Sequence, residues 1–203
     1  MIAHALTIVR NELDRHLATY GGNSPHADLG NVAEVAAAAN GTSRNKVLLS
    51  LVNLQEERSL RNVPAYVKDE AALTVRYENP PTFLNLAVLV TATHTSYADG
   101  LLALSRTLLF FQHRSVFTQD TVDPSSLTTG APVNDLDRLV EFRMVFTLGS
   151  PTLEEVNDMW GMLGGKQFPF ALYTVRMLEL RFRATPREGR LVGEVVTEVV
   201  HRT

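Results

Sequence analysis

The sequence predicts an α+β fold, in which a mixed or mainly antiparallel sheet packs with about three helices. Three segments carry apolar residues at helical spacing, and about five others show the apolar runs or the alternation of β-strands. These elements follow one another in an uneven order, which is typical of α+β domains. The length of 203 residues, 45% of them hydrophobic, suits a single domain spanning 1–203 with a core of ordinary size.

The first two predicted helices have clear boundaries. An apolar stripe from Ile2 to Leu17 defines the first, and Gly21 ends it, since glycine accepts the left-handed conformation at a helix end. The second begins after Ser96, a residue type that caps helices, and runs to about His113. One apolar stripe of this helix is expected to face the sheet.

The third predicted helix begins with a capping box. Thr152 and Glu155 have the T-x-x-E spacing, and Gly164 follows the last apolar residue. Trp160 is expected to anchor this helix in the core. The expected apolar face comprises Leu153, Val156, Trp160 and Leu163.

Five segments are predicted as strands of the sheet. They are rich in β-branched and aromatic residues, and most are bounded by turn residues. A turn is expected at 186–189, before the last strand. The predicted strands are Lys46–Leu54, Phe83–His94, Leu139–Leu148, Ala171–Arg183 and Leu191–Val200.

Three segments have no clear periodicity. The alanine-rich segment 29–39 is compatible with a short helix, a strand or a mobile arm. Residues 60–82 are predicted as a proline-containing loop, in which Val75 and Tyr77 form a small edge strand. Residues 118–135 are predicted as a second long loop, and loops of this length are often functional or disordered.

Composition narrows the classes of partner. The net charge of −3 argues against non-specific nucleic-acid binding, which needs a cationic surface. The absence of cysteine excludes disulfides and thiolate zinc sites, and it is consistent with folding in a reducing cytoplasm. The longest apolar run, Leu86–Val90, is far shorter than the ~20 residues that span a bilayer. We therefore expect neither a nucleic-acid nor a membrane partner.

No set of residues predicts catalysis, a metal site or a cofactor. Gly164–Lys166 resembles a phosphate loop but follows a helix, whereas phosphate loops precede one. Glu154 and Glu155 lie in a helix first turn, where negative charge is favourable for structural reasons. The scattered histidines are expected to be solvent-facing or at an interface; they are His4, His16, His26, His94, His113 and His201.

Taken together, several segments resemble the cap, or tail-terminator, proteins of phage-tail-like contractile injection systems. The strongest are NKVLLSLVNLQEER, ENPPTFLNL and LEEVNDMWGMLGGKQFPFALYTVR. The resemblance implies a homo-hexameric ring at the distal end of the tail, in contact with the inner tube protein and, in many systems, the sheath protein. It implies no active site. The particle would assemble in the cytoplasm and then be released or stay in the cell.

Seven residues are candidates for interfaces. Arg58, Arg61 and Arg76 flank the first long loop as a cationic patch, although a plain solvated loop is an equal alternative. The second long loop is expected to reach a neighbour or the tube as an arm, so that deleting 120–133 leaves the fold intact. Strand 191–200 or strand 139–148 is expected at a subunit boundary. The remaining candidates are Asp120 and Asp123 of the second loop, and Val195 and Val199 of the last strand.

Three other functions remain open. The first is a baseplate or tube-associated adaptor of the same machine, which composition does not separate from a cap. The second is an enzyme with an unfamiliar site, although no acid, base and nucleophile can be assembled from the sequence. The third is a binding module unrelated to injection machines.

Overall fold

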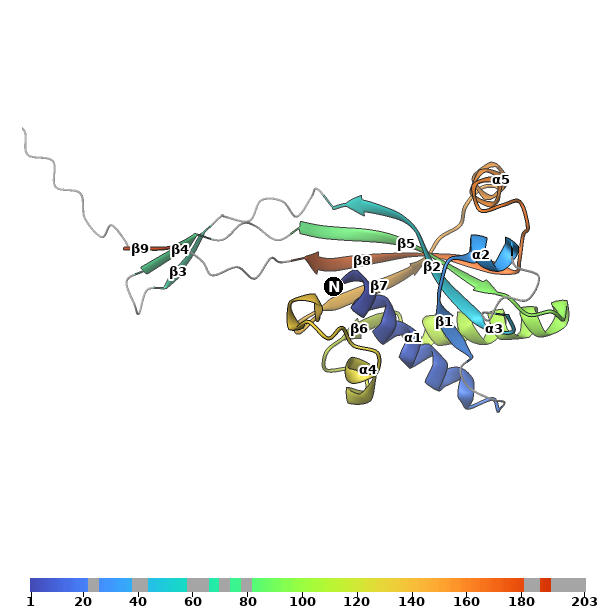
Figure 1. The fold of residues 1–203 in the computed structure, drawn as a ribbon, viewed down its shortest axis with the longest axis horizontal. Coiled ribbons are helices and arrows are strands. Elements are labelled where there is room, and N and C mark those ends of the chain that lie inside the picture. Colours follow the sequence, from blue (N-terminus) through green and yellow to red (C-terminus); the bar gives the residue numbers. More distant parts are fainter. Residues whose placement is uncertain are drawn as a thin grey trace, which may run out of the picture.

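A computed structural model describes residues 1–21, 26–37, 44–57, 66–69, 74–77, 82–180 and 187–190. They form a six-stranded sheet covered by helices and a separate three-stranded sheet beyond one end of it (Figure 1). The fold is α+β, as the sequence predicts.

The six-stranded sheet is mixed and mainly antiparallel. Its strand order is β1-β2-β5-β8-β7-β6, and only the β1–β2 pair is parallel. β2 stays in the sheet through Glu56, two residues beyond its predicted end, although Gln55 and Glu56 have left the core. The bounds are β1 Ala27–Leu29, β2 Val47–Glu56, β5 Thr82–Ala92, β8 Phe170–Leu180, β7 Arg143–Leu148 and β6 Val116–Thr118.

The three-stranded sheet has the order β3-β4-β9. Its strands are β3 Tyr66–Asp69, β4 Thr74–Tyr77 and β9 Arg187–Arg190. The predicted small strand around Val75 is therefore real but central rather than at an edge. The predicted turn at 186–189 is wrong for 187–189, because β9 pairs with β4 there.

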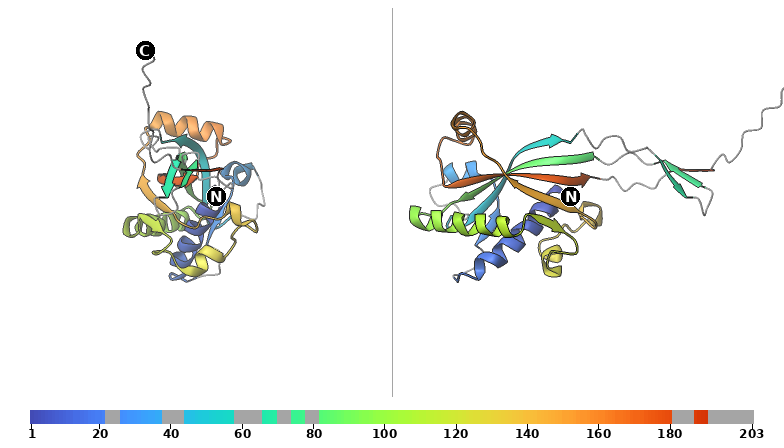
Figure 2. Two further views of the ribbon diagram at one scale, coloured as in Figure 1. Left: turned by 90° about the vertical axis from the view of Figure 1, so that its left-hand side faces the viewer. Right: turned by 180° about the vertical axis from the view of Figure 1, so that it is seen from behind.

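Two long helices cover one face of the six-stranded sheet (Figure 2). They are α1 Ile2–Ala18 and α3 Tyr97–His113, and both match the prediction. Ser96 caps α3 by accepting a hydrogen bond from the Asp99 N–H. Between helices and sheet lies the larger core, in which the rings of Phe111 and Phe146 stack at 4.8 Å.

The opposite face carries a smaller core under α5 Leu153–Met162 and the short α2 Val32–Ala37. The capping box of α5 is formed, and Trp160 is buried against the sheet as expected. Leu153, however, is 88% exposed, because α5 packs on the sheet only from Val156 onward.

Segment 118–135 is not the long loop that the sequence predicts. It contains helix α4 Pro124–Thr128 and, at its end, the first residue of a 3-10 turn at Asp135–Asp137. Asp123 caps α4 and Pro124 is its first residue, which together are a typical helix start. No apolar stripe follows this start in the sequence, because the helix is so short. Segment 29–39, left open above, holds α2, and β1 ends at Leu29. Predicted strand 191–200 lies outside the described residues.

Candidate interface surfaces

The outer edge of β2 is only partly covered. β1 pairs with Val47–Leu49, and among the described residues no strand pairs with the outer side of β2 from Leu51 to Glu56. The Glu57 N–H donates to the Phe83 carbonyl of β5, so by alternation the Leu54 N–H points away from β5. Asn53 Oδ1 accepts that N–H at 2.8 Å, a local bond that an incoming strand can replace.

An apolar cavity lies directly beside this edge. Its volume is about 460 Å³, and it separates β2 from the end of α5. Leu51 and Leu54 are 41% and 43% exposed, and Met162 is 82% exposed. The lining residues are Gly30, Asn31, Ser50, Leu51, Val52, Met159, Met162 and Leu163.

The opposite edge of the sheet is also incomplete. β6 pairs with Arg143–Val145 of β7 and leaves Thr147 and Leu148 uncovered within the described part of the chain. Beside them, a groove of about 650 Å³ runs between α3 and strands β7 and β8, with Leu109 and Leu148 more than half exposed on its rim. Strand 139–148 is predicted to offer a docking edge, but over Arg143–Val145 the outer edge of β7 is already occupied by β6, and Val145 has a strand partner on both sides.

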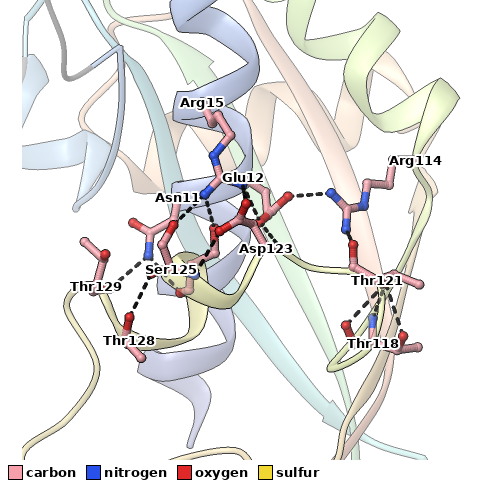
Figure 3. A network of polar contacts seen from close by, with 11 residues as sticks. Asn11, Glu12, Arg15, Arg114, Thr118, Thr121, Asp123, Ser125, Thr128 and Thr129 are labelled. Atoms are coloured by element: carbon pink, nitrogen blue, oxygen red, sulfur yellow. Dashed lines mark hydrogen bonds and ion pairs between the residues drawn. The ribbon is translucent and has the colours of Figure 1, made fainter.

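A network of charged and polar side chains links α1 to segment 118–129 (Figure 3). We refer to this region as the corner. The Glu12 side chain is only 4% exposed, and its carboxylate accepts hydrogen bonds from Arg114 and from the Asp123 N–H. Arg15 bridges Glu12 at 3.4 Å and Asp123 at 3.0 Å. The network thus holds the start of α4 against α1.

The Asp123 carboxylate is engaged within this corner, by an ion pair with Arg15 and a hydrogen bond from the Ser125 N–H. Hydrogen bonds from the side chain and backbone of Ser125, and the nearby Arg15 guanidinium, lower the pKa of the Asp123 carboxyl. Asp120 is exposed and accepts a hydrogen bond from its neighbour Gln119. Of the two acidic candidates, only Asp120 presents a carboxylate that is free of ion pairs with described residues.

His4 is buried, contrary to the expectation of a solvent-facing or interface imidazole. Only 2% of it is exposed. Its Nε2 donates to the Leu127 carbonyl at 3.0 Å, and its Nδ1 accepts the Leu139 N–H at 2.9 Å. These roles require the neutral tautomer with the proton on Nε2. His4 therefore ties α1 to α4 at Leu127 and to the chain before β7 at Leu139. Its position one turn before Ile8 is only a weak sequence signal for this role.

A family model described as the Pvc16 N-terminal domain matches residues 4–194. The chain belongs to the Pvc16 N-terminal domain family. No curated protein matches. The resemblance to terminator proteins inferred from the sequence is thus confirmed at the level of the family.

Two solved structures share the fold of this Pvc16 N-terminal domain chain. One is the sheath/tube terminator of PVC, an extracellular contractile injection system, in the extended state, with a TM-score of 0.55 and 16% identity over 97% of this chain. The other is the tube-terminating cap of the anti-feeding prophage, with a TM-score of 0.54 and 16% identity over 94% of this chain. The chain spans 63% and 60% of the lengths of those two proteins.

Of the other candidate residues of this family member, the structure describes only Arg76. Arg58, Arg61, Val195 and Val199 lie outside the described residues, and Arg76 lies in the central strand β4. Within the described ranges there is no cluster of three His, Asp or Glu side chains suited to a metal ion. None of the helices in those ranges is long and apolar enough to cross a bilayer.

Proposed function

We propose that this chain is a cap protein, which forms a ring on the distal end of a contractile injection system and ends the growth of tube and sheath. The family match over residues 4–194 carries the proposal. The shared fold with two terminator proteins supports it. The role is structural, and the particle assembles in the cytoplasm before it is released or retained.

The shape of the sheet is compatible with a ring. A head-to-tail contact that closes after a fixed rotation gives a ring, and it needs two different surfaces on each copy. The uncovered parts of β2 and β7 lie at opposite edges of one sheet, and each exposes leucines. A homo-hexamer built from such contacts presents one face to the last layer of tube.

The length of the tails tests this function. Particles made in cells that lack the chain are expected to be overlong, unstable or absent, because nothing stops polymerisation. Supplying the chain again should restore a single length. Tails of normal length and yield without the chain would contradict a capping role and favour an adaptor elsewhere in the machine.

A further inference from the structure

We propose that segment Leu191–Val200 of one copy adds as a strand to the outer edge of β2 in the next copy of the ring, between Leu51 and Glu56. This inference rests on the proposed ring and names the contact that links its subunits. Strand addition to an open edge uses backbone hydrogen bonds for affinity and side-chain pockets for selection.

The acceptor has both parts that strand addition needs. Beyond Leu49 the outer backbone of β2 lacks a strand partner among the described residues, over a length close to that of an average strand. The Leu54 N–H is held only by the side chain of the preceding residue. The cavity lined by Leu51, Val52 and Met162 lies beside this edge and is of a size to receive apolar side chains.

The donor is a segment whose sequence needs a partner. LVGEVVTEVV is rich in valine, a residue that favours strands, and five of its ten residues are valine. A single strand leaves its backbone groups unpaired unless it joins a sheet. Two glutamates separate its valine positions, and charges of this kind limit unspecific pairing of a strand with other chains.

The place where this segment begins favours a second copy over the same copy. It follows Arg190, the last residue of β9. β9 belongs to the three-stranded sheet, which lies beyond the end of the six-stranded sheet and away from α3 and α5 (Figures 1 and 2). Each copy therefore donates segment 191–200 from a projecting part, and the repeat of this donation around the ring generates identical contacts.

Disulfide trapping tests the pairing directly, since the native chain has no cysteine. One variant carries Leu54→Cys, and the others each carry one cysteine at position 192, 195, 196 or 199. Capped particles from cells that make two such variants are oxidised and analysed without reductant. We expect a disulfide-linked dimer of the two variants at one or two of the positions, because a disulfide forms only between closely opposed residues.

Two outcomes of the trapping experiment would overturn the proposal. One is no dimer at any of the four positions. The other is a disulfide that forms only within one chain, in a double variant that carries both cysteines. The matched control places the first cysteine at Asp120, which is exposed on the far edge beyond β6, and it should give no dimer.

A proline variant tests the function of the edge. In Leu54→Pro the lost N–H points away from β5, so the pairing of β2 with β5 is kept, whereas strand addition is blocked. We expect the fraction of capped tails to fall by about tenfold, and Leu54→Val to cap normally. Circular dichroism of both variants checks that the fold is retained.

The tests separate the contact from the function. Normal capping by folded Leu54→Pro particles would overturn the contact and leave the cap role standing. If the wild-type chain is absent from the tail end, the cap role itself fails. If Leu54→Pro does not fold, the trapping experiment with Leu54→Cys decides.

Discussion

The corner between α1 and α4 and the outer edge of β2 are built in opposite ways. At the corner, buried Glu12 and His4 each have hydrogen-bond partners from distant parts of the chain. At the edge, the backbone of β2 from Leu51 onward has no second strand among the described residues, and leucines are exposed. The corner thus serves the stability of one subunit, whereas the edge is the surface that we propose for a contact between subunits.

The largest loss of stability is expected from the core behind the corner. Phe117 is fully buried and packs its ring against those of Phe110 and Phe146. Phe117→Ala should lower the free energy of unfolding by about 4 kcal/mol, because it opens a cavity among the rings. Urea denaturation measures this loss. Leu109→Ala, at an exposed position on α3, is the control and should change stability by less than ~0.5 kcal/mol.

The next largest effect is expected from Glu12 itself. Glu12→Ala leaves the partly buried Arg114 without its carboxylate and the Asp123 N–H without its acceptor. We expect the free energy of unfolding to fall by about 3 kcal/mol. Asp120→Ala, which removes an exposed carboxylate from the same segment, is the matched control. An equal loss in the two variants would show that the corner is not specially stabilising.

A smaller, pH-dependent effect is expected at Asp123. Its pKa is lowered below 3.8 in the folded chain, first by Ser125 and then by Arg15. A lowered pKa stabilises the fold above the unfolded value of 3.8, and this stabilisation is lost as the pH falls through the folded value. The free energy of unfolding of the Asp123→Asn variant should therefore depend less on pH in this acid range than that of the wild type. The urea midpoints of Asp123→Asn and the wild type are measured in parallel as the pH is lowered. If both change equally, Asp123 is not a source of this pH-dependent stability.

The smallest effect on stability is expected at the edge. Leu51 is 41% exposed and has no strand beside it in the described part of the chain. Leu51→Ser should change the free energy of unfolding of the isolated subunit by less than ~0.5 kcal/mol. The same variant should reduce capping in the tail-length assay. If Leu51→Ser were unstable but capped tails normally, Leu51 would serve the stability of the subunit and not a contact between subunits.

The sequence predicts the parts of the fold that have local signals. α1, α3 and α5 were predictable because the apolar stripe and the terminal residues of each helix are local in the sequence. Thr152 and Glu155 of the α5 capping box are an example. α4 and β6 were missed because each is too short for periodicity to show. Their positions depend on distant partners, such as the Asp123 N–H bonded to Glu12.

The candidate surface could be predicted only in part. The family resemblance was readable from the order of segments. No local pattern reveals that β1 stops at Leu29 and leaves Leu51–Glu56 of β2 without an outer strand among the described residues. Strand pairing is set by the whole sheet, so an edge is a property of topology. The buried roles of His4 and Glu12 are equally non-local, since their partners lie more than one hundred residues away.

The position of the chain on the particle tests the central claim most directly. The sequence has no cysteine, so Asp120→Cys provides a single exposed site for a gold label. Electron microscopy of labelled particles should show gold only at the end of the tube opposite the baseplate, with averaged end views that show a closed ring. Label at the baseplate, along the shaft or absent from purified particles would contradict the account.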